Sequence, residues 1–187
     1  MAPLFYFGDM RITAGKHRGR ILKAPKSRDI RPMMDKVRKA LFDSLGPQVE
    51  GAKVLDLFCG TGALGLEALS RGAKKVIFVD QSGEALSLVK ENLSSLKETA
   101  EIKRLTLPKG LKNLFSEAPF DLIFITPPYG TGLALKTLKK IEPFLAEDGV
   151  VVVEENTEEN FPEEIEGLIK FREKTYGQTR LHFYRRR

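Results

Sequence analysis

The sequence predicts an α/β fold in which a mostly parallel sheet carries helices on both faces. Short, nearly continuous apolar segments alternate with segments whose apolar residues recur at helical spacing. This alternation is typical of β-α-β units and of parallel strands buried on both faces. Two further segments with alternating apolar and polar residues flank Gly177-Gln178 and predict a C-terminal antiparallel hairpin. A chain of 187 residues, 42% of them hydrophobic, can bury a full core in one domain.

The first 47 residues precede this alternation and predict a small extension made of a β-hairpin and a helix. Two short strands are expected at 10–14 and 20–24, with a charged tip between them. A helix is expected from Met34, since apolar residues recur at helical spacing until Gly46-Pro47 stops it. The main domain is expected to span 48–187.

The main domain begins with an apolar strand near Val54 and a helix over 63–70. We expect the next elements in the order strand, helix, strand, short helix, strand, helix, strand, at 75–80, 82–96, 101–105, 111–115, 120–125, 135–145 and 149–154. The hairpin strands follow at 169–176 and 179–185. In such a sheet, ligands bind beyond the carboxyl ends of the strands.

Positive charge is concentrated at the start of the chain. Residues 1–38 contain ten Lys or Arg and three Asp, whereas the remaining 149 residues carry a net charge of −1 out of the total of +6. A basic arm on a balanced domain indicates a phosphate-rich partner, most simply a nucleic acid, although a merely solubilising surface is the alternative. The candidate nucleic-acid contacts are Arg11, Lys16, His17, Arg18, Arg20, Arg31 and Arg38.

The first expected strand of the main domain runs into the glycine-rich segment GTGALG at 60–65. Alone, this segment is a weak dinucleotide fingerprint, with Asp80 placed to bind ribose hydroxyls. Asp56 would repel a pyrophosphate but suits an ammonium group, which favours S-adenosylmethionine; the alternative is that Asp56 only caps the turn. The candidate cofactor residues are Asp56, Phe58, Gly60, Gly62, Asp80 and Gln81.

A second special turn, Thr126-Pro127-Pro128-Tyr129, follows the strand at 120–125. Proline has no N–H and a fixed φ, so nearby carbonyls are held as free acceptors. The Pro127 carbonyl and the side chain at 126 could bind both hydrogens of a nucleobase amine and turn its lone pair toward a methyl group. Tyr129 could stack on a base pulled from its helix. A packed, proline-rich structural turn is the alternative.

Other functional classes lack the necessary residues. The single cysteine, Cys59, and two histidines exclude an internal disulfide and a multi-cysteine metal site, so we expect no metal. No apolar run approaches a membrane span, and the N-terminus lacks signal-peptide features. We expect a cytoplasmic, monomeric protein with no membrane partner.

The chain resembles the bacterial small-subunit (16S) ribosomal RNA guanine methyltransferases of the RsmD type. The resemblance rests on MRITAGKHRGRIL, RPMMDKVRKALFD, VLDLFCGTGALGLEALSRGA, FDLIFITPPYG and REKTYGQTRLHFY. It implies a Rossmann-like class I methyltransferase fold with a seven-stranded sheet and S-adenosylmethionine as cofactor, S-adenosylhomocysteine being the product. It also implies methylation of a guanine 2-amino group in ribosomal RNA or the assembling small subunit, with the basic extension gripping RNA.

Three positions depart from that family. Thr126 stands where the family has an acid, so it offers an uncharged acceptor with less reach. No acid follows the third strand, at 104–108, to contact the adenine, and Met33-Met34 replace a commoner Thr. Two alternatives therefore stay open: a non-catalytic RNA-binding or ribosome-assembly protein, and an enzyme that methylates an adenine amino group in DNA.

Overall fold

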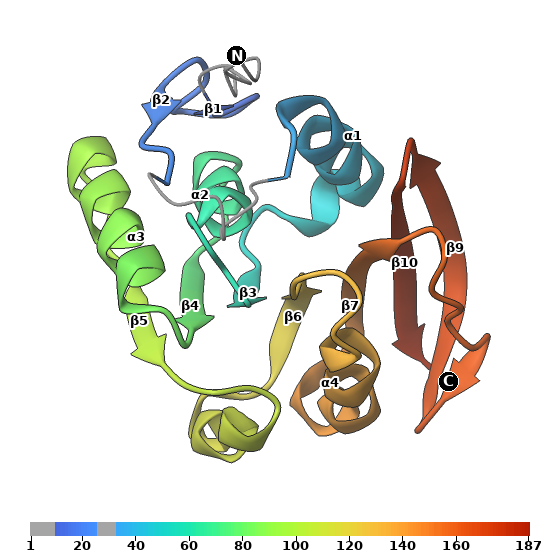
Figure 1. Cartoon of the computed structure of the whole chain (residues 1–187). Coiled ribbons are helices and arrows are strands. Elements are labelled where there is room, and N and C mark those ends of the chain that lie inside the picture. The colour runs from blue at the N-terminus through green and yellow to red at the C-terminus, as the bar shows by residue number, and fades with distance from the viewer. Residues whose placement is uncertain (1–9, 26–32) are drawn as a thin grey trace, which may run out of the picture.

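The computed structural model describes residues 10–25 and 33–187 and contains a three-layer α/β domain (Figure 1). The main sheet has the strand order β5-β4-β3-β6-β7-β10-β9-β8. Its strands are β3 (Lys53–Leu57), β4 (Lys75–Asp80), β5 (Glu101–Arg104), β6 (Phe120–Ile125), β7 (Leu145–Asn156), β8 (Glu164–Ile165), β9 (Leu168–Tyr176) and β10 (Thr179–Arg186). Strands β5, β4, β3, β6 and β7 run parallel, and β10, β9 and β8 add antiparallel pairs. The predicted mostly parallel fold is confirmed, and the two-residue β8 adds one strand to the seven predicted.

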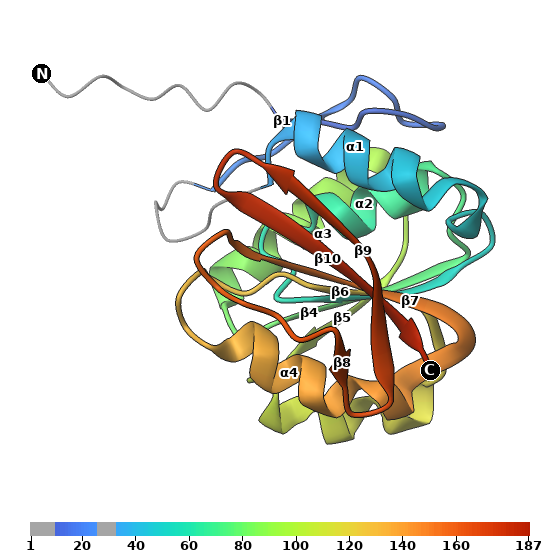
Figure 2. The ribbon, with the colours of Figure 1, turned by 90° about the vertical axis from the view of Figure 1, so that its right-hand side faces the viewer.

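Helices cover both faces of the sheet, as Figures 1 and 2 show. One face packs against α1 (Asp35–Leu45), α2 (Ala63–Ser70) and α3 (Gly83–Leu96), the other against α4 (Leu133–Ile141) and the 3₁₀ segment η2 (Lys109–Glu117). Two short 3₁₀ turns, η1 (Gly46–Gln48) and η3 (Glu142–Phe144), end α1 and α4. The central strands are buried on both faces because each supplies alternate side chains to two separate cores.

The N-terminal extension lies on the outer side of the α2 and α3 layer (Figure 1). Its strands β1 (Met10–Arg11) and β2 (Ile21–Leu22) are shorter than predicted. Met10, Ile12 and Leu22 are buried in the same core as α1 and α2. The extension therefore has no core of its own, and a domain boundary at residue 47 stays a prediction.

Strands β3, β4 and β6 end at the same level of the sheet, and the two special turns begin there. Leu57 of β3 pairs with Val79 of β4 on one side and with Ile125 of β6 on the other. The residues that follow these three positions therefore reach the same carboxyl edge of the sheet. This register brings together the glycine turn, Asp80 and Thr126.

Candidate active site

The glycine turn is a tight left-handed loop between β3 and α2. Phe58, Gly60 and Gly62 have φ values of 57°, 54° and 80°, a region that L side chains rarely adopt. A Cβ at Gly65 would lie 2.3 Å from the Phe78 ring, so this position requires glycine for helix-to-sheet packing. The glycines therefore allow this tight turn at the carboxyl edge of the sheet, where a cofactor would bind.

Asp80 supports this turn from the neighbouring strand. Its Oδ2 accepts a hydrogen bond from the Gly60 N–H at 3.0 Å, and its Oδ1 accepts one from the Ser82 N–H at 2.9 Å. The side chain is only partly buried, and each carboxylate oxygen can accept a further bond. Asp80 can therefore support the loop and still bind a ribose hydroxyl.

Asp56 lies beneath the turn and has no exposed surface. Its Oδ2 accepts the Gly65 N–H at 3.0 Å, so the carboxylate supports the first turn of α2. Its buried Oδ1 has no hydrogen-bond partner among the described residues. Burial, with a smaller effect from Asp80, raises the pKa of Asp56 to about 8. The structure shows the capping role, while contact with the cofactor ammonium stays a prediction.

A cavity of about 590 Å³ opens beside Asp80, between the loops that follow β4 and β5. It is lined by Gln81, Ser82, Arg104, Leu105 and Thr106. The Arg104 Nε donates to the Gln81 carbonyl at 2.9 Å, which joins the two loops. No carboxylate lines this cavity, in agreement with the missing acid noted in the sequence.

Thr126 connects the second special turn to the first. Its hydroxyl lies 3.3 Å from the Phe58 carbonyl and 3.4 Å from the Leu57 carbonyl, to which it can donate. A hydroxyl that donates its hydrogen keeps lone pairs to accept another bond. Pro127 is buried and Pro128 is exposed, so the turn is rooted in the sheet edge while part of it faces solvent.

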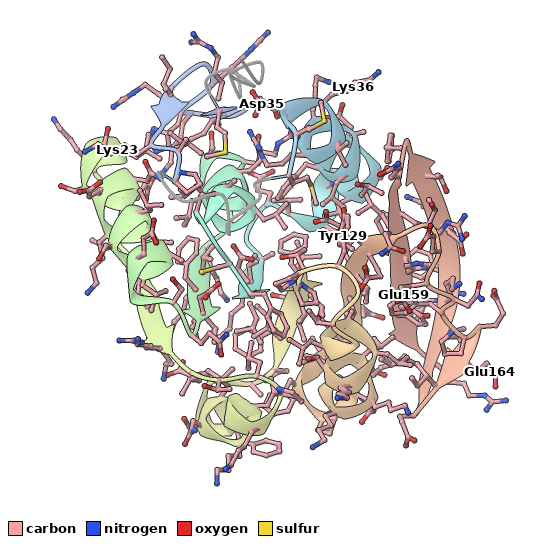
Figure 3. All side chains as sticks on the ribbon, in the orientation of Figure 1. Lys23, Asp35, Lys36, Tyr129, Glu159 and Glu164 are labelled. Atoms are coloured by element: carbon pink, nitrogen blue, oxygen red, sulfur yellow. The ribbon has the colours of Figure 1, made fainter. Side chains whose placement is uncertain are left out.

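The Tyr129 side chain is held by residues of two strands, β7 and β10. Its hydroxyl donates to Glu154 Oε1 at 2.5 Å and lies 2.8 Å from Thr179 Oγ1. Figure 3 shows Tyr129 between the loop after β6 and the strands β7 and β10. Burial and the neighbouring Glu154 raise the pKa of the phenol, and burial raises the pKa of Glu154. Tyr129 is 40% exposed, so the side chain is fixed in orientation at its hydroxyl while the residue stays open to solvent in part.

Next to this pair, Glu155 fixes the backbone of the same turn. It is buried, and its Oε1 accepts the Gly130 N–H at 3.3 Å and the Asn156 N–H at 2.8 Å. The sequence analysis connected neither acid with this turn. The signal available was the position of Glu154 and Glu155 at the end of an apolar strand, the edge where ligands bind.

Comparisons with known proteins agree with this geometry. The family model described as "Conserved hypothetical protein 95" matches residues 10–185. The Escherichia coli K12 ribosomal RNA small subunit methyltransferase D is 35% identical over 182 residues, covering 96% of this chain and 91% of that protein. This chain belongs to the RsmD family of methyltransferases. S-adenosylmethionine is accordingly its methyl donor.

Two more relatives extend the match over the whole length. The Bacillus subtilis protein YlbH, named as a candidate rRNA methyltransferase, is 40% identical over 183 residues, covering 95% of this chain and all of that protein. The solved structure of Escherichia coli yhhF has a TM-score of 0.82 and 33% identity, covering 96% of this chain and 98% of that one. The predicted class I methyltransferase fold is confirmed by this family.

The predicted RNA contacts on the hairpin fall into two groups. Arg11, Lys16, Arg18 and Arg20 are exposed, although Lys16 pairs with Glu98 at 2.6 Å and Arg20 donates to the Ser95 carbonyl at 2.8 Å. The His17 side chain is 14% exposed, and its Nε2 lies 2.8 Å from Glu98. The exposed arginines stay candidates for RNA, whereas His17 mainly anchors the hairpin tip to the domain. Arg31 lies outside the described residues.

The prediction that Arg38 contacts RNA is wrong. Arg38 has no exposed surface, and its guanidinium pairs with Glu67 at 3.1 Å and with Asp35 at 2.8 Å. Because these bonds and a bond to the Arg11 carbonyl occupy the guanidinium, it is not available to a phosphate. Sequence reasoning also missed Glu67, for which the local signal was Arg71, four residues later at the C-terminal cap of α2.

Cys59 is buried beside the turn, and burial raises the pKa of its thiol. A protonated, buried thiol is a poor nucleophile, so Cys59 acts in packing beside the glycine turn. Within residues 10–25 and 33–187, no three His, Cys, Asp or Glu side chains form a group that could bind a metal ion. Among the helices that the structure describes, none is long and apolar enough to cross a membrane.

Proposed function

We propose that this protein transfers a methyl group from S-adenosylmethionine to the exocyclic 2-amino group of a guanine in small-subunit ribosomal RNA. The observation that carries the proposal is that the Thr126 hydroxyl lies 3.3 Å from the Phe58 carbonyl, so the turn proposed to bind the amine adjoins the turn proposed to bind the cofactor. The substrate class is supported by relatives named as small-subunit rRNA methyltransferases, three of which are at least 35% identical.

The cofactor would lie along the carboxyl edge of β3 and β4. Gly60 and Gly62 would face its methionine and ribose, and Asp80 would accept the ribose hydroxyls. The cavity beside Gln81 has space for the adenine ring. The buried Oδ1 of Asp56, which has no hydrogen-bond partner among the described residues, would accept the ammonium group, directly or through water. The sulfonium of the cofactor would supply the methyl group, and the residues of the chain would hold the cofactor in position.

The amine would be oriented by two acceptors on the second turn. Its lone pair is delocalised into the base, so it attacks only when its hydrogens are held and the lone pair faces the methyl group. The Pro127 carbonyl and the Thr126 oxygen would accept the two hydrogens. After transfer the nitrogen is cationic and acidic, so water or a weak acceptor can take its proton. No covalent enzyme intermediate is needed, in agreement with the buried thiol of Cys59.

The target base would be stacked against Tyr129. Base stacking on an aromatic ring contributes about 1–3 kcal/mol, enough to offset much of the cost of pulling a base out of its helix. The hydroxyl bonds to Glu154 and Thr179 hold the ring before the base arrives. Such preorganisation lowers the entropic cost of positioning the amine.

The decisive experiment compares three substitutions at position 126 with the wild type. Single-turnover transfer to 16S ribosomal RNA should fall in Thr126→Val, which keeps the shape but removes the acceptor, and should stay close to the wild-type rate in Thr126→Ser. Thr126→Asp should raise the rate by up to about tenfold, because a charge-assisted bond replaces a neutral one at a gain of about 1.4 kcal/mol. If Val were as active as Thr, the side chain at 126 would have no part in orienting the amine.

Mass spectrometry of the RNA nucleosides identifies the product. N2-methylguanosine that appears only with active protein supports the proposal. Bound RNA without any methylated nucleoside would favour the non-catalytic RNA-binding alternative. Methylated adenine in a DNA substrate, with none in RNA, would favour the DNA alternative.

A further inference from the structure

The C-terminal hairpin carries a second concentration of positive charge. Residues 168–187 contain seven Lys or Arg and a single acid, Glu173. Four of the seven form ion pairs with carboxylates, namely Lys170, Arg180, Arg186 and Arg187. The other three are Arg172, Lys174 and Arg185, and no described carboxylate forms an ion pair with them. The uncompensated charge of this hairpin therefore resides in these three side chains.

The register of the strands places Arg172 and Lys174 on the side of the sheet that faces α1. Arg172 lies opposite Phe183 and Lys174 opposite Leu181, and both partners are buried in the core beneath α1. Residues directly opposite each other in an antiparallel pair share a face of the sheet. Both cations also reach the last turn of α1, since Arg172 donates to the Ser44 carbonyl at 3.1 Å and Lys174 to its Oγ at 2.6 Å.

Aromatic rings hold the two arginines in place. The Arg172 guanidinium lies 5.8 Å from the centre of the Phe171 ring and 5.7 Å from that of Phe183, and Arg185 lies 5.3 Å from Phe171. Cation–π contacts do not neutralise the charge and leave the guanidinium N–H groups available to phosphate oxygens. Phe171 itself is 37% exposed. Fixed arginines beside an exposed ring are the features that bind the backbone and bases of single-stranded nucleic acid.

This surface joins the two RNA-related parts of the molecule. Helix α1 contacts the N-terminal hairpin through Asp35 and the C-terminal hairpin through Ser44, positions about 14 Å apart along its axis. Lys36, on the same helix, projects away from the body (Figure 3). In Figure 2, α1 lies beside the β9–β10 hairpin, and β1 lies near the start of α1. At its tip, the hairpin meets the catalytic turn through the contact between Thr179 and Tyr129.

We propose that Arg172, Lys174 and Arg185, with Phe171, form a second RNA-binding surface that continues from the basic N-terminal hairpin across α1 to the catalytic turn. This inference rests on the proposed RNA substrate. The surface would bind the phosphate backbone of RNA flanking the target guanine. It would determine how the RNA is oriented on the enzyme, without taking part in methyl transfer.

The test measures the salt dependence of binding to a 16S ribosomal RNA fragment by fluorescence anisotropy. Arg172→Ala/Arg185→Ala should reduce the slope of log Kd against log salt by about 1.4, about 0.7 for each lost single-strand phosphate contact. Arg172→Lys/Arg185→Lys keeps both charges and should restore most of the slope. Lys139→Ala/Lys140→Ala, which removes two exposed lysines from α4 on the other face of the sheet, is the control of equal charge.

Equal slopes for the alanine double variant and the α4 control would overturn the proposal. Unchanged S-adenosylmethionine affinity in all variants, measured by calorimetry, would show that the fold is intact. Nucleoside analysis of RNA treated with the wild-type protein distinguishes failure of the proposed methyl transfer from failure of the proposed RNA-binding surface. If RNA gained no methyl group while the slope still fell selectively, the surface would stand and the proposed reaction would fail.

Discussion

Replacing Glu67 by Gln should separate the basic N-terminal hairpin from the methyltransferase fold. Glu67 lies in α2 with no exposed surface and accepts hydrogen bonds from two elements of the extension. Its carboxylate binds the Thr13 N–H and hydroxyl, each at 2.9 Å, the Ala14 N–H at 3.2 Å and the Arg38 Nε at 3.1 Å. Arg71, the C-cap residue of α2, also donates to it at 2.9 Å.

The expected loss in the free energy of unfolding is about 3–5 kcal/mol, the range for removing one partner from a buried ion pair. Gln keeps the size of Glu but leaves the buried Arg38 with Asp35 as its one carboxylate partner among the described residues, and the amide NH₂ of Gln faces other donors. Burial alone would raise the pKa of Glu67, but hydrogen bonds from Thr13, Arg71 and Arg38 lower it. A carboxyl with a lowered pKa stabilises the fold above its unfolded pKa of about 4.5, and this contribution is lost as the pH falls below that value.

Urea unfolding at pH 7 and at pH 4 tests this reasoning. The difference between wild type and Glu67→Gln should be large at pH 7 and smaller at pH 4. Glu98→Gln is the control, because Glu98 pairs with Lys16 and His17 near the surface and should cost less than about 1 kcal/mol. A loss below 1 kcal/mol in Glu67→Gln, or one independent of pH, would refute the claim that this carboxylate holds the extension in place.

Three further changes test the site itself. Asp80→Ala should lower S-adenosylmethionine affinity by at least about 1 kcal/mol in calorimetry, and unchanged affinity would remove Asp80 from the cofactor site. Arg18→Ala/Arg20→Ala should weaken RNA binding and flatten its salt slope by about 0.7–0.9 per lost contact, while cofactor affinity stays the same; an unaltered slope would mean that these charges do not meet phosphate. Tyr129→Phe keeps the ring but loses the bonds to Glu154 and Thr179, so single-turnover methyl transfer should fall by up to about tenfold, and a wild-type rate would show that the hydroxyl does not position the ring.

The order of strands and helices was predictable because it depends on local patterns. The apolar runs of β3, β4, β6 and β7 are long enough to specify strands without knowledge of their partners. The glycine turn was predictable for a similar reason, since Gly62 and Gly65 meet needs of backbone angle and packing that no other residue satisfies. The two-residue β8 has no such pattern, and its pairing with β9 depends on the tertiary fold.

The partners of the charged residues could not be predicted in this way. Arg38 and Glu67 are 29 residues apart, and Tyr129 and Glu154 are 25 apart, so no periodicity connects them. In the sequence alone, Arg38 is indistinguishable from the other cations of the basic N-terminal segment. Only its burial distinguishes it from Arg18 and Arg20, which are exposed.

The basic arm therefore contains cations with two different functions. Arg38 contributes to stability, because a buried guanidinium needs its carboxylate partners and offers nothing to RNA. Arg18 and Arg20 remain at the surface, where the attraction of phosphates is a matter of charge and salt. The net charge of this segment overstates its capacity for RNA, since part of it neutralises Glu67. The opposite holds at the other end of the chain, where the near-neutral total of residues 39–187 conceals the unpaired cations Arg172 and Arg185. Burial and pairing, more than net charge, decide which cations are available to bind the substrate.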